Sequence, residues 1–399
     1  MKAIRIILMR HKTIWTPALV CVFFLSCSRP LGSQGLSQTQ INAPIPDPDP
    51  EPGQRNIKVA ILLDTSGSMN GLIEQAKSQL WAIVNKLADA RSNGVAPKLE
   101  IALYHYGNST LPGSNGYIQM LTPLTTDLDL FSENLFSLTT NGGSEFCGQA
   151  IQTALSQLEW SNNEDDLQMI FIAGNEPFTQ GHVPYAEACI AAKDRGIIVN
   201  TIFCGDHQAG INTAWKSGAD LTYGNYSSIN HNARTVYYNT PFDQDIADWN
   251  YRLNQTYVWY GADGKTYYER QAAQDEEATK YGAANVAMRS SFKSKASYEN
   301  SRWDLVDKME QDSTVIKELK NEDLPENMRT MDSEEREEYV QEKAEERKKI
   351  QAKIKELNTQ REAHIAEQKK SNAIDQNNLG EVLIESIVTQ ANGKNFKFE

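Results

Sequence analysis

Apolar runs along the chain alternate with segments whose apolar residues recur at helical spacing. Apart from Lys58, the run at 57–63 is aliphatic and rich in β-branched residues, as expected for a strand buried on both faces, and it ends at Asp64. A short Ser/Gly loop follows, and Leu72 to Ala90 then carries its apolar residues on one helical side. We therefore predict a strand, a loop and a helix at the start of the folded region.

The same alternation continues through residue 260. Further strands are expected at 99–106, 117–121, 167–173, 196–203 and 226–229, and helices at 128–138, 148–160, 184–195, 209–219 and 246–260. Strands that alternate with helices predict an α/β domain, Rossmann-like, with a doubly wound and mostly parallel sheet.

The pattern changes after residue 262. Residues 263–330 are polar with scattered aromatic residues, and we expect them to form helices that pack on the first domain. Residues 332–370 are dense in Glu, Lys and Arg and lack Gly and Pro, which predicts one long helix. Its apolar positions keep only a rough seven-residue rhythm, so ion pairs four residues apart are favoured over a coiled coil. We divide the chain into an α/β domain at 57–262 and a helical extension at 263–399.

The N-terminal region has the pattern of an export signal. Residues 1–12 carry four Lys and Arg residues, and 13–25 form an uncharged, mostly apolar run that is too short to span a bilayer as a helix. The run ends in the sequence FLSC, which resembles a bacterial lipobox, in which the cysteine receives lipid and becomes the new N-terminus. We predict a signal peptide at 1–26 and acylation of Cys27.

Residues 27–56 resemble a tether. Prolines alternate with other residues from 46 to 52, which is typical of an extended spacer, although a tail without a role predicts the same conformation. The signal and the acylated cysteine together predict a protein of the bacterial cell envelope, lipid-anchored to a membrane and facing the periplasm. The sequence does not say which membrane.

Composition narrows the classes of function. With 40% hydrophobic and 23% charged residues among 399, the chain has the make-up of an ordinary globular protein. Acidic residues outnumber basic ones by 52 to 39, giving a formal charge of -13, which disfavours nucleic acid as a partner. Cations and basic partners fit this charge better.

The candidate chemistry lies in the loop after the first strand. Asp64, Ser66 and Ser68 stand at i, i+2 and i+4 at the carboxyl end of a strand, where open α/β sheets bind their ligands. One carboxylate and two hydroxyls in a turn can direct their oxygens to one point, and hard divalent cations such as Mg²⁺ bind oxygen. A turn that caps the next helix would need the same residue types.

The segment 59–69 resembles the opening of a von Willebrand factor type A domain. The resemblance covers residues 57 to 262 and implies that Asp64, Ser66 and Ser68 belong to a metal-ion-dependent adhesion site. The second element of that site in the family, often Gly-Gly-Thr before a helix, is matched by a Gly-Gly-Ser sequence that ends at Ser144 and keeps the hydroxyl.

The third element departs from the family pattern. Where the family usually has Thr-Asp-Gly after the central strand, this chain has the sequence AGNEP at 173–177, so the usual acid is absent. Glu145, Asn175 and Glu176 are the candidates to replace it, directly or through water, and the sequence does not choose among them. We expect a divalent cation, Mg²⁺ first and Mn²⁺ or Ca²⁺ as alternatives, with Asp64 as its principal anionic ligand. The expected ligands are Asp64, Ser66, Ser68, Ser144 and Glu145.

The resemblance implies a binding role and no enzyme activity. Family members typically bind protein partners, and a carboxylate of the partner completes the coordination of the metal. We therefore expect a role in adhesion or complex assembly with a partner that presents an acidic residue. Two alternatives stay open: a scaffold with a degenerate metal site that contacts partners through its helical extension, and a metal-assisted hydrolase. His207 could serve the hydrolase as a base, but the Gly-x-Ser-x-Gly signature is absent.

Two cysteines are expected at the ligand-bearing edge of the sheet. Cys147 begins a predicted helix and Cys204 follows a predicted strand, and an exported protein meets oxidising conditions. A disulfide between them and two separate buried thiols are both compatible with the sequence. Cys189 lies in the middle of a predicted helix and is expected to be a small buried hydrophobic residue.

Overall fold

The computed structural model describes residues 53–233, 235, 237–371 and 378–398. The predicted signal peptide, Cys27 and the tether as far as residue 52 lie outside the described residues. The chain divides into two compact units at 1–44 and 45–399, and all described residues belong to the second.

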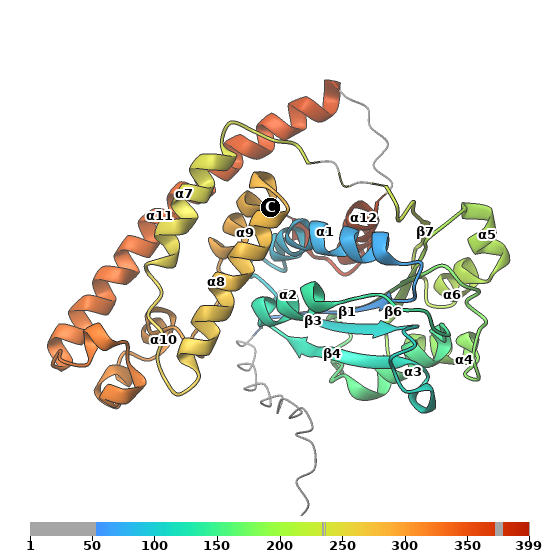
Figure 1. Ribbon diagram of the computed structural model, residues 1–399, viewed down its shortest axis with the longest axis horizontal. Coiled ribbons are helices and arrows are strands. Elements are labelled where there is room, and N and C mark those ends of the chain that lie inside the picture. The colour runs from blue at the N-terminus through green and yellow to red at the C-terminus, as the bar shows by residue number, and fades with distance from the viewer. Residues whose placement is uncertain (1–52, 234, 236, 372–377, 399) are drawn as a thin grey trace, which may run out of the picture. The chain divides into compact units, whose positions relative to one another are not determined.

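A six-stranded sheet in the order β4-β3-β1-β5-β6-β7 forms the centre of the α/β domain (Figure 1). β3 and β4 pair antiparallel, and the other neighbours pair parallel. This arrangement confirms the predicted doubly wound, mostly parallel sheet. The strands are β1 (Asn56–Asp64), β3 (Lys98–Tyr106), β4 (Ile118–Thr125), β5 (Leu167–Gly174), β6 (Ile198–Phe203) and β7 (Tyr226–Ser228).

Helices cover both faces of the sheet. One face carries α1 (Asn70–Ala88), α2 (Leu128–Ser137) and α12 (Leu379–Gly393), and the other carries α3 (Cys147–Gln157), α4 (Tyr185–Asp194) and α6 (Trp215–Asp220). Because side chains of a strand alternate between faces, β1 contributes Val59 and Leu63 to the first core and Ala60 and Leu62 to the second. This double burial explains why the run at 57–63 is apolar except for Lys58, which pairs with Glu100.

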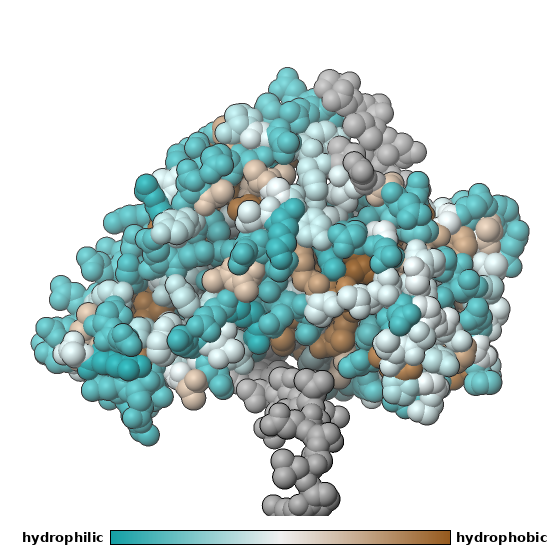
Figure 2. Space-filling model, viewed as in Figure 1, coloured by the Kyte–Doolittle hydropathy of each residue, from teal (hydrophilic) through white to brown (hydrophobic). Residues whose placement is uncertain are grey.

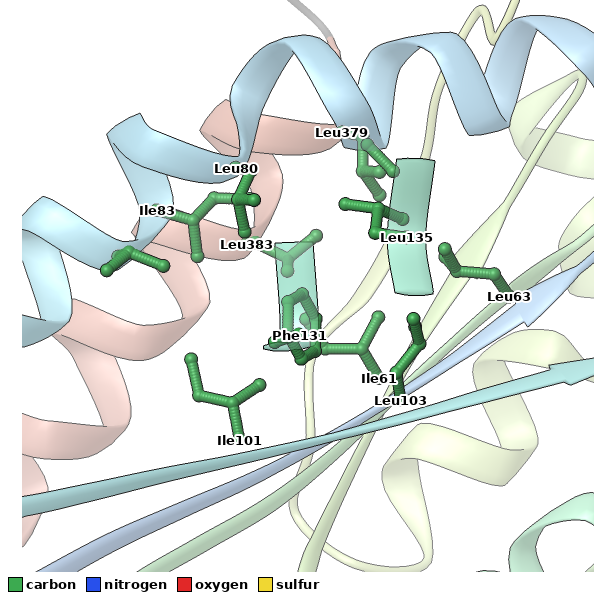
Figure 3. A pocket seen from close by; sticks show the side chains of 12 residues that line it. Ile61, Leu63, Leu80, Ile83, Ile101, Leu103, Phe131, Leu135, Leu379 and Leu383 are labelled. Atoms are coloured by element: carbon green, nitrogen blue, oxygen red, sulfur yellow. The ribbon is translucent and has the colours of Figure 1, made fainter. Parts of the chain in front are cut away.

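The C-terminal helix α12 returns to the α/β domain. Its Leu379 and Leu383 face α1 and the sheet around an apolar cavity of about 20 Å³ (Figure 3). Gln390 of α12 and Asn200 of β6 exchange two hydrogen bonds between their amides, the Asn200 amide donating at 3.1 Å. The strand β8 (Lys397–Phe398) pairs with β2 (Ala90–Arg91) after α1. The segment 379–398 is therefore part of the α/β core, although the boundary predicted at residue 262 had assigned it to the helical extension.

The helical extension packs on α1 and α2, as expected. It contains α8 (Gly264–Lys280), α9 (Ala283–Lys293), α10 (Leu305–Gln311) and α11 (Ser333–Ser371). The helix α7 (Asp243–Asn254), which lies before the boundary predicted at residue 262, packs against α9 and α11. α11 matches the predicted long helix; Ile350, Ile354 and Leu357 are buried on its inner side, and much of its outer surface is hydrophilic (Figure 2). Within the described ranges, no helix combines the length and the apolar character that a membrane span needs.

One predicted helix is two helices in the structure. The segment expected at 209–219 forms α5 (His207–Asn212) and α6, and Ala214 between them has a φ of 73°. A left-handed residue cannot continue an α-helix, so the chain changes direction there. The break sets α6 against β6.

Candidate metal centre

Asp64 lies at the topological switch point, where the strand order of the sheet reverses. It ends β1, whose neighbours β3 and β5 lie on opposite sides, and ligands of open α/β sheets bind at such a point. The side chain is 0% exposed, and its Oδ1 accepts a hydrogen bond of 2.7 Å from the backbone N–H of Ser66. The next turn, in which Met69 N–H donates to the Ser66 carbonyl at 3.0 Å, leads directly into α1. The carboxylate is therefore held in place by its own loop.

The backbone of Thr65 joins this loop to two others. Its N–H donates to the Tyr106 carbonyl at the end of β3 (2.8 Å), and its carbonyl accepts from the N–H of Asn141 (2.9 Å). The Asn108 amide donates both to the Thr65 carbonyl at 3.3 Å and to the Thr139 carbonyl at 3.1 Å. The loops after β1, after β3 and before α3 thus form one connected edge.

Two glycines make room for the carboxylates. A Cβ at Gly107, whose φ is 75°, would lie 2.7 Å from Cγ of Glu145 and 2.8 Å from Oδ1 of Asp64. A Cβ at Gly174, the last residue of β5, would lie 3.2 Å from Oδ2 of Asp64. Glu145 and Asp64 therefore meet over Gly107, and a larger residue there would displace both side chains.

The two carboxyl groups are buried and hydrogen-bond with each other and with Ser66, but neither has a basic partner among the described residues. Glu145 is 5% exposed, and its Oε2 and the Oδ2 of Asp64 have no hydrogen-bond partner among the described residues. Burial raises the pKa of Asp64, and burial together with the nearby charge of Asp64 raises the pKa of Glu145. The negative charge of the exposed Glu176 raises the pKa of both groups further, while hydrogen bonds with Ser66 lower it.

Ser68 connects the first loop to the loop after β5. Its Oγ lies 3.5 Å from Oγ of Ser66, and the Asn175 amide donates to it at 3.1 Å. The other end of that amide, Oδ1, is buried and has no hydrogen-bond partner among the described residues. Oxygens from three loops thus lie along one continuous chain of contacts.

This donor set fits a hard divalent cation. Asp64 Oδ2, Glu145 Oε2 and Asn175 Oδ1 are buried oxygens without partners in the described part of the chain, and a cation that binds oxygen would satisfy them. No group of three or more His, Cys, Asp or Glu side chains that could hold a metal occurs within the described ranges. The donors here are instead two carboxylates, two hydroxyls and an amide.

The structure brings most of the predicted ligands together. Asp64, Ser66, Ser68 and Glu145 are in the contacts above, whereas Ser144 is half-buried one residue before Glu145. No hydrogen bond of the Ser144 hydroxyl is found among the described residues. Ser144 therefore shares the loop with the site, and its part in binding stays a prediction.

The disulfide considered between Cys147 and Cys204 is not formed in this structure. Both residues are buried free thiols, as is Cys189. Cys147 packs in the core that contains α3, and Cys204 packs in the core that contains α1, so the sheet lies between their side chains. Position at one edge of the sheet had suggested proximity, but the two residues face opposite layers. Burial raises the pKa of each thiol, which keeps both protonated.

Two histidines near this edge differ in position. His207, considered above as a base, is exposed at the start of α5, and its Nδ1 lies 3.1 Å from Oγ of Ser228 on β7. His231 lies against the backbone of Ser68 and Cys204, and burial lowers its pKa. Sequence reasoning singled out neither His231 nor Gly107, because both lie in loops outside any motif. It could single out Asn175, since that residue directly follows the central strand.

Residues 58–247 match the von Willebrand factor type A domain. Similar solved structures include the conserved hypothetical protein BatB from Bacteroides thetaiotaomicron, with 17% identity, a TM-score of 0.33 and coverage of 44% of this chain and 90% of that one. The SpRpn10 VWA domain has 20% identity and a TM-score of 0.34, with 44% and 88% covered. An aerotolerance-related membrane protein from Bacteroides fragilis has 18% identity and a TM-score of 0.31, with 44% and 94% covered. The comparison with curated proteins gave no match.

Proposed function

Because residues 58–247 form a von Willebrand factor type A domain, we propose that the protein is a cation-dependent protein-binding module of the bacterial cell envelope. Domains of this family generally mediate interactions between proteins. In this proposal Asp64, Ser66, Ser68 and Glu145 hold a divalent cation, with Ser144 as a further candidate. The partner contributes an acidic group, and the chain acts by binding rather than by catalysis.

The observation that supports the proposal is the pair of buried carboxyl groups at the switch point of the sheet. Unpaired buried carboxylates are costly, and a cation between Asp64 and Glu145 would offset that cost. Mg²⁺ is the first candidate, and Mn²⁺ and Ca²⁺ also bind oxygen donors. When bound, such an ion would supply a positive centre that attracts a carboxylate of the partner. The residues of this chain would fix its position.

Metal titration followed by calorimetry tests the proposal directly. We expect the wild type to bind Mg²⁺, Mn²⁺ or Ca²⁺, and Asp64→Ala to weaken binding by about 100-fold or more, because it removes the anionic ligand held by the loop. Ser66→Ala should weaken it by about tenfold, since water can partly replace a neutral oxygen. Asp165→Ala, which removes an exposed carboxylate before β5, is the matched control and should bind as the wild type does.

Affinity capture of envelope proteins with and without a chelator extends the test to the partner. Capture that needs the cation and fails with Asp64→Ala supports the proposal. If the wild type binds no cation at millimolar concentration, the assignment of an adhesion site is wrong, and the alternative of a scaffold with a degenerate metal site is preferred.

Membrane anchoring through Cys27 is a second part of the proposal, supported by the lipobox-like sequence. Acyl chains would hold the α/β domain at a membrane surface. Cys27→Ala should move the protein from the membrane to the soluble fraction and lower its mass by that of the lipid. Cys21→Ala, within the signal peptide, is the matched control and should stay with the membrane. Unchanged fractionation of Cys27→Ala would contradict the anchor.

A further inference from the structure

We propose that Asn175 is an additional, neutral oxygen ligand of the cation and that Glu145 supplies from the second loop the negative charge that the third loop lacks. This inference rests on the proposed function. It assigns a role to a residue outside the expected ligand set and predicts that the charge can be moved between the two loops.

The inference rests first on the position of Asn175. β5 ends at Gly174, which lies against the unpartnered Oδ2 of Asp64. The next residue, Asn175, uses its amide nitrogen to bind Oγ of Ser68 and leaves Oδ1 buried without a partner among the described residues. A buried amide oxygen is costly to leave unsatisfied, and here it belongs to a side chain already fixed on a candidate ligand. A cation beside Asp64 and Ser68 would satisfy it.

Glu145 approaches Asp64 from the other side. Its Cγ and the Oδ1 of Asp64 both lie over Gly107, whereas the third loop lies beside Oδ2. The backbone N–H of Glu145 donates to Oε1 of Gln180 at 3.2 Å, and Gln180 belongs to the loop after β5. The second and third loops are therefore tied together, with a carboxylate on one and an amide on the other.

The charges of this arrangement are balanced for a divalent ion. Asp64 and Glu145 together carry two negative charges when ionised, and Asn175 adds an oxygen without charge. Asn and Asp have nearly the same shape, so Asn175→Asp moves a carboxylate to the third loop with little change in volume. Ser68 can then donate its hydroxyl proton to the new carboxylate.

Glu176 does not fill this role in the structure. Its side chain is exposed, and its Oε2 accepts a hydrogen bond of 3.3 Å from Gln180. It acts on Asp64 and Glu145 only through its charge. The half-buried neighbour Asn175, whose Oδ1 is buried, rather than the exposed acid next to it, is therefore the residue assigned to the ion.

A charge-swap experiment with Mn²⁺, Mg²⁺ and Ca²⁺ as probes tests the inference by calorimetry. Glu145→Gln and Asn175→Ala should each weaken binding by about 10- to 100-fold. The double variant Glu145→Gln/Asn175→Asp should recover to within about threefold of the wild type, because it again has two carboxylates at the site. The matched control Glu145→Gln/Asn162→Asp has the same net charge, with the added acid on an exposed loop, and should stay as weak as Glu145→Gln.

The outcomes distinguish a failure of this inference from a failure of the proposed function. Recovery in the charge-swap variant but not in its control supports the inference. If the wild type binds cation but the charge-swap variant binds no better than Glu145→Gln, or Asn175→Ala binds as tightly as the wild type, the inference is wrong and the proposed function stands. If the wild type binds no cation, the proposed function itself fails. Circular dichroism of every variant confirms that the comparison concerns folded protein.

Discussion

Carboxylates are buried both at the sheet edge and between α2, α8 and α9, but among the described residues only the second group is paired with basic side chains. We call this second group the ion-pair cluster; it consists of Asp129, Asp275, Arg289, Lys293 and Tyr298. Arg289 binds Asp129 at 2.8 Å and also pairs with Asp275, and Lys293 binds Asp275 at 2.9 Å. Arg289 is 1% exposed and Lys293 is 0% exposed.

The two groups have opposite electrostatic consequences. Burial alone would raise the pKa of Asp275, but Lys293 and Arg289 outweigh it and hold that pKa well below its ordinary value. At the sheet edge burial dominates, and the pKa values of Asp64 and Glu145 are raised. The ion-pair cluster joins α2 to α8 and α9 and so holds the extension on the α/β domain. The edge pair has no basic partner of this kind among the described residues, which is why we propose that it binds a cation.

The largest expected effect comes from breaking the ion-pair cluster. Arg289→Ala removes a basic partner from two buried carboxylates at once and should lower the free energy of unfolding by about 3–5 kcal/mol. Lys265→Ala, which removes a 67% exposed partner of Glu269, should change it by less than about 0.5 kcal/mol. Urea unfolding at pH 7 measures both. A loss below about 1 kcal/mol for Arg289→Ala would show that the cluster does not stabilise the fold as described.

A smaller effect should appear in the pH dependence of stability. The pKa of Glu145 rises from 4.5 to about 8 on folding, so between these values the folded chain holds a proton that the unfolded chain has released. Without divalent cation the stability should therefore fall as pH rises through this window, with a slope of at most about 1.4 kcal/mol per pH unit for the one proton involved. Glu145→Gln should flatten the slope.

Thermal unfolding from pH 4.5 to 8 measures this dependence. The difference between wild type and Glu145→Gln reports on Glu145 together with Asp64, because the two carboxyl groups share a hydrogen bond and the pKa of Asp64 is also raised, to about 6. Asp307, whose pKa burial raises to about 7, contributes equally to both proteins. Saturating Mg²⁺ or Mn²⁺ should reverse the slope in the wild type, because ionised carboxylates bind the ion. Parallel curves for the two proteins would show that the edge carboxyl does not hold its proton.

Local features of the fold could be predicted from the sequence, and long-range features could not. The strand at 57–63, Asp64 at its end and the long helix α11 depend on patterns within a few residues of one another. The return of α12 to the core depends on contacts across the whole chain, and its apolar residues alone do not name their partner. The split at Ala214 depends on a backbone conformation that alanine rarely adopts.

The candidate site likewise combines features that could be predicted from the sequence with features that could not. The motif identified Asp64, Ser66 and Ser68, and the following Gly-Gly-Ser led to Glu145. The sequence could not choose among Glu145, Asn175 and Glu176 because burial decides between them, and burial depends on Gly107 and on the loop after β5. It also left open whether Cys147 and Cys204 form a disulfide or stay separate thiols, because the edge of a sheet can be predicted more readily than the layer that a side chain faces.

The smallest expected effect concerns Glu176, an exposed charge next to the buried pair. Its carboxylate influences Asp64 and Glu145 through space, so Glu176→Gln should weaken cation binding by about two- to threefold at low salt. At about 0.5 M monovalent salt the difference should vanish, because ions in solution screen an exposed charge. Glu187→Gln, an exposed acid on α4, is the control and should change nothing at either salt concentration. A salt-independent loss as large as that of Glu145→Gln would instead make Glu176 a direct ligand, and the distinction between buried and exposed carboxylates at this edge would then be wrong.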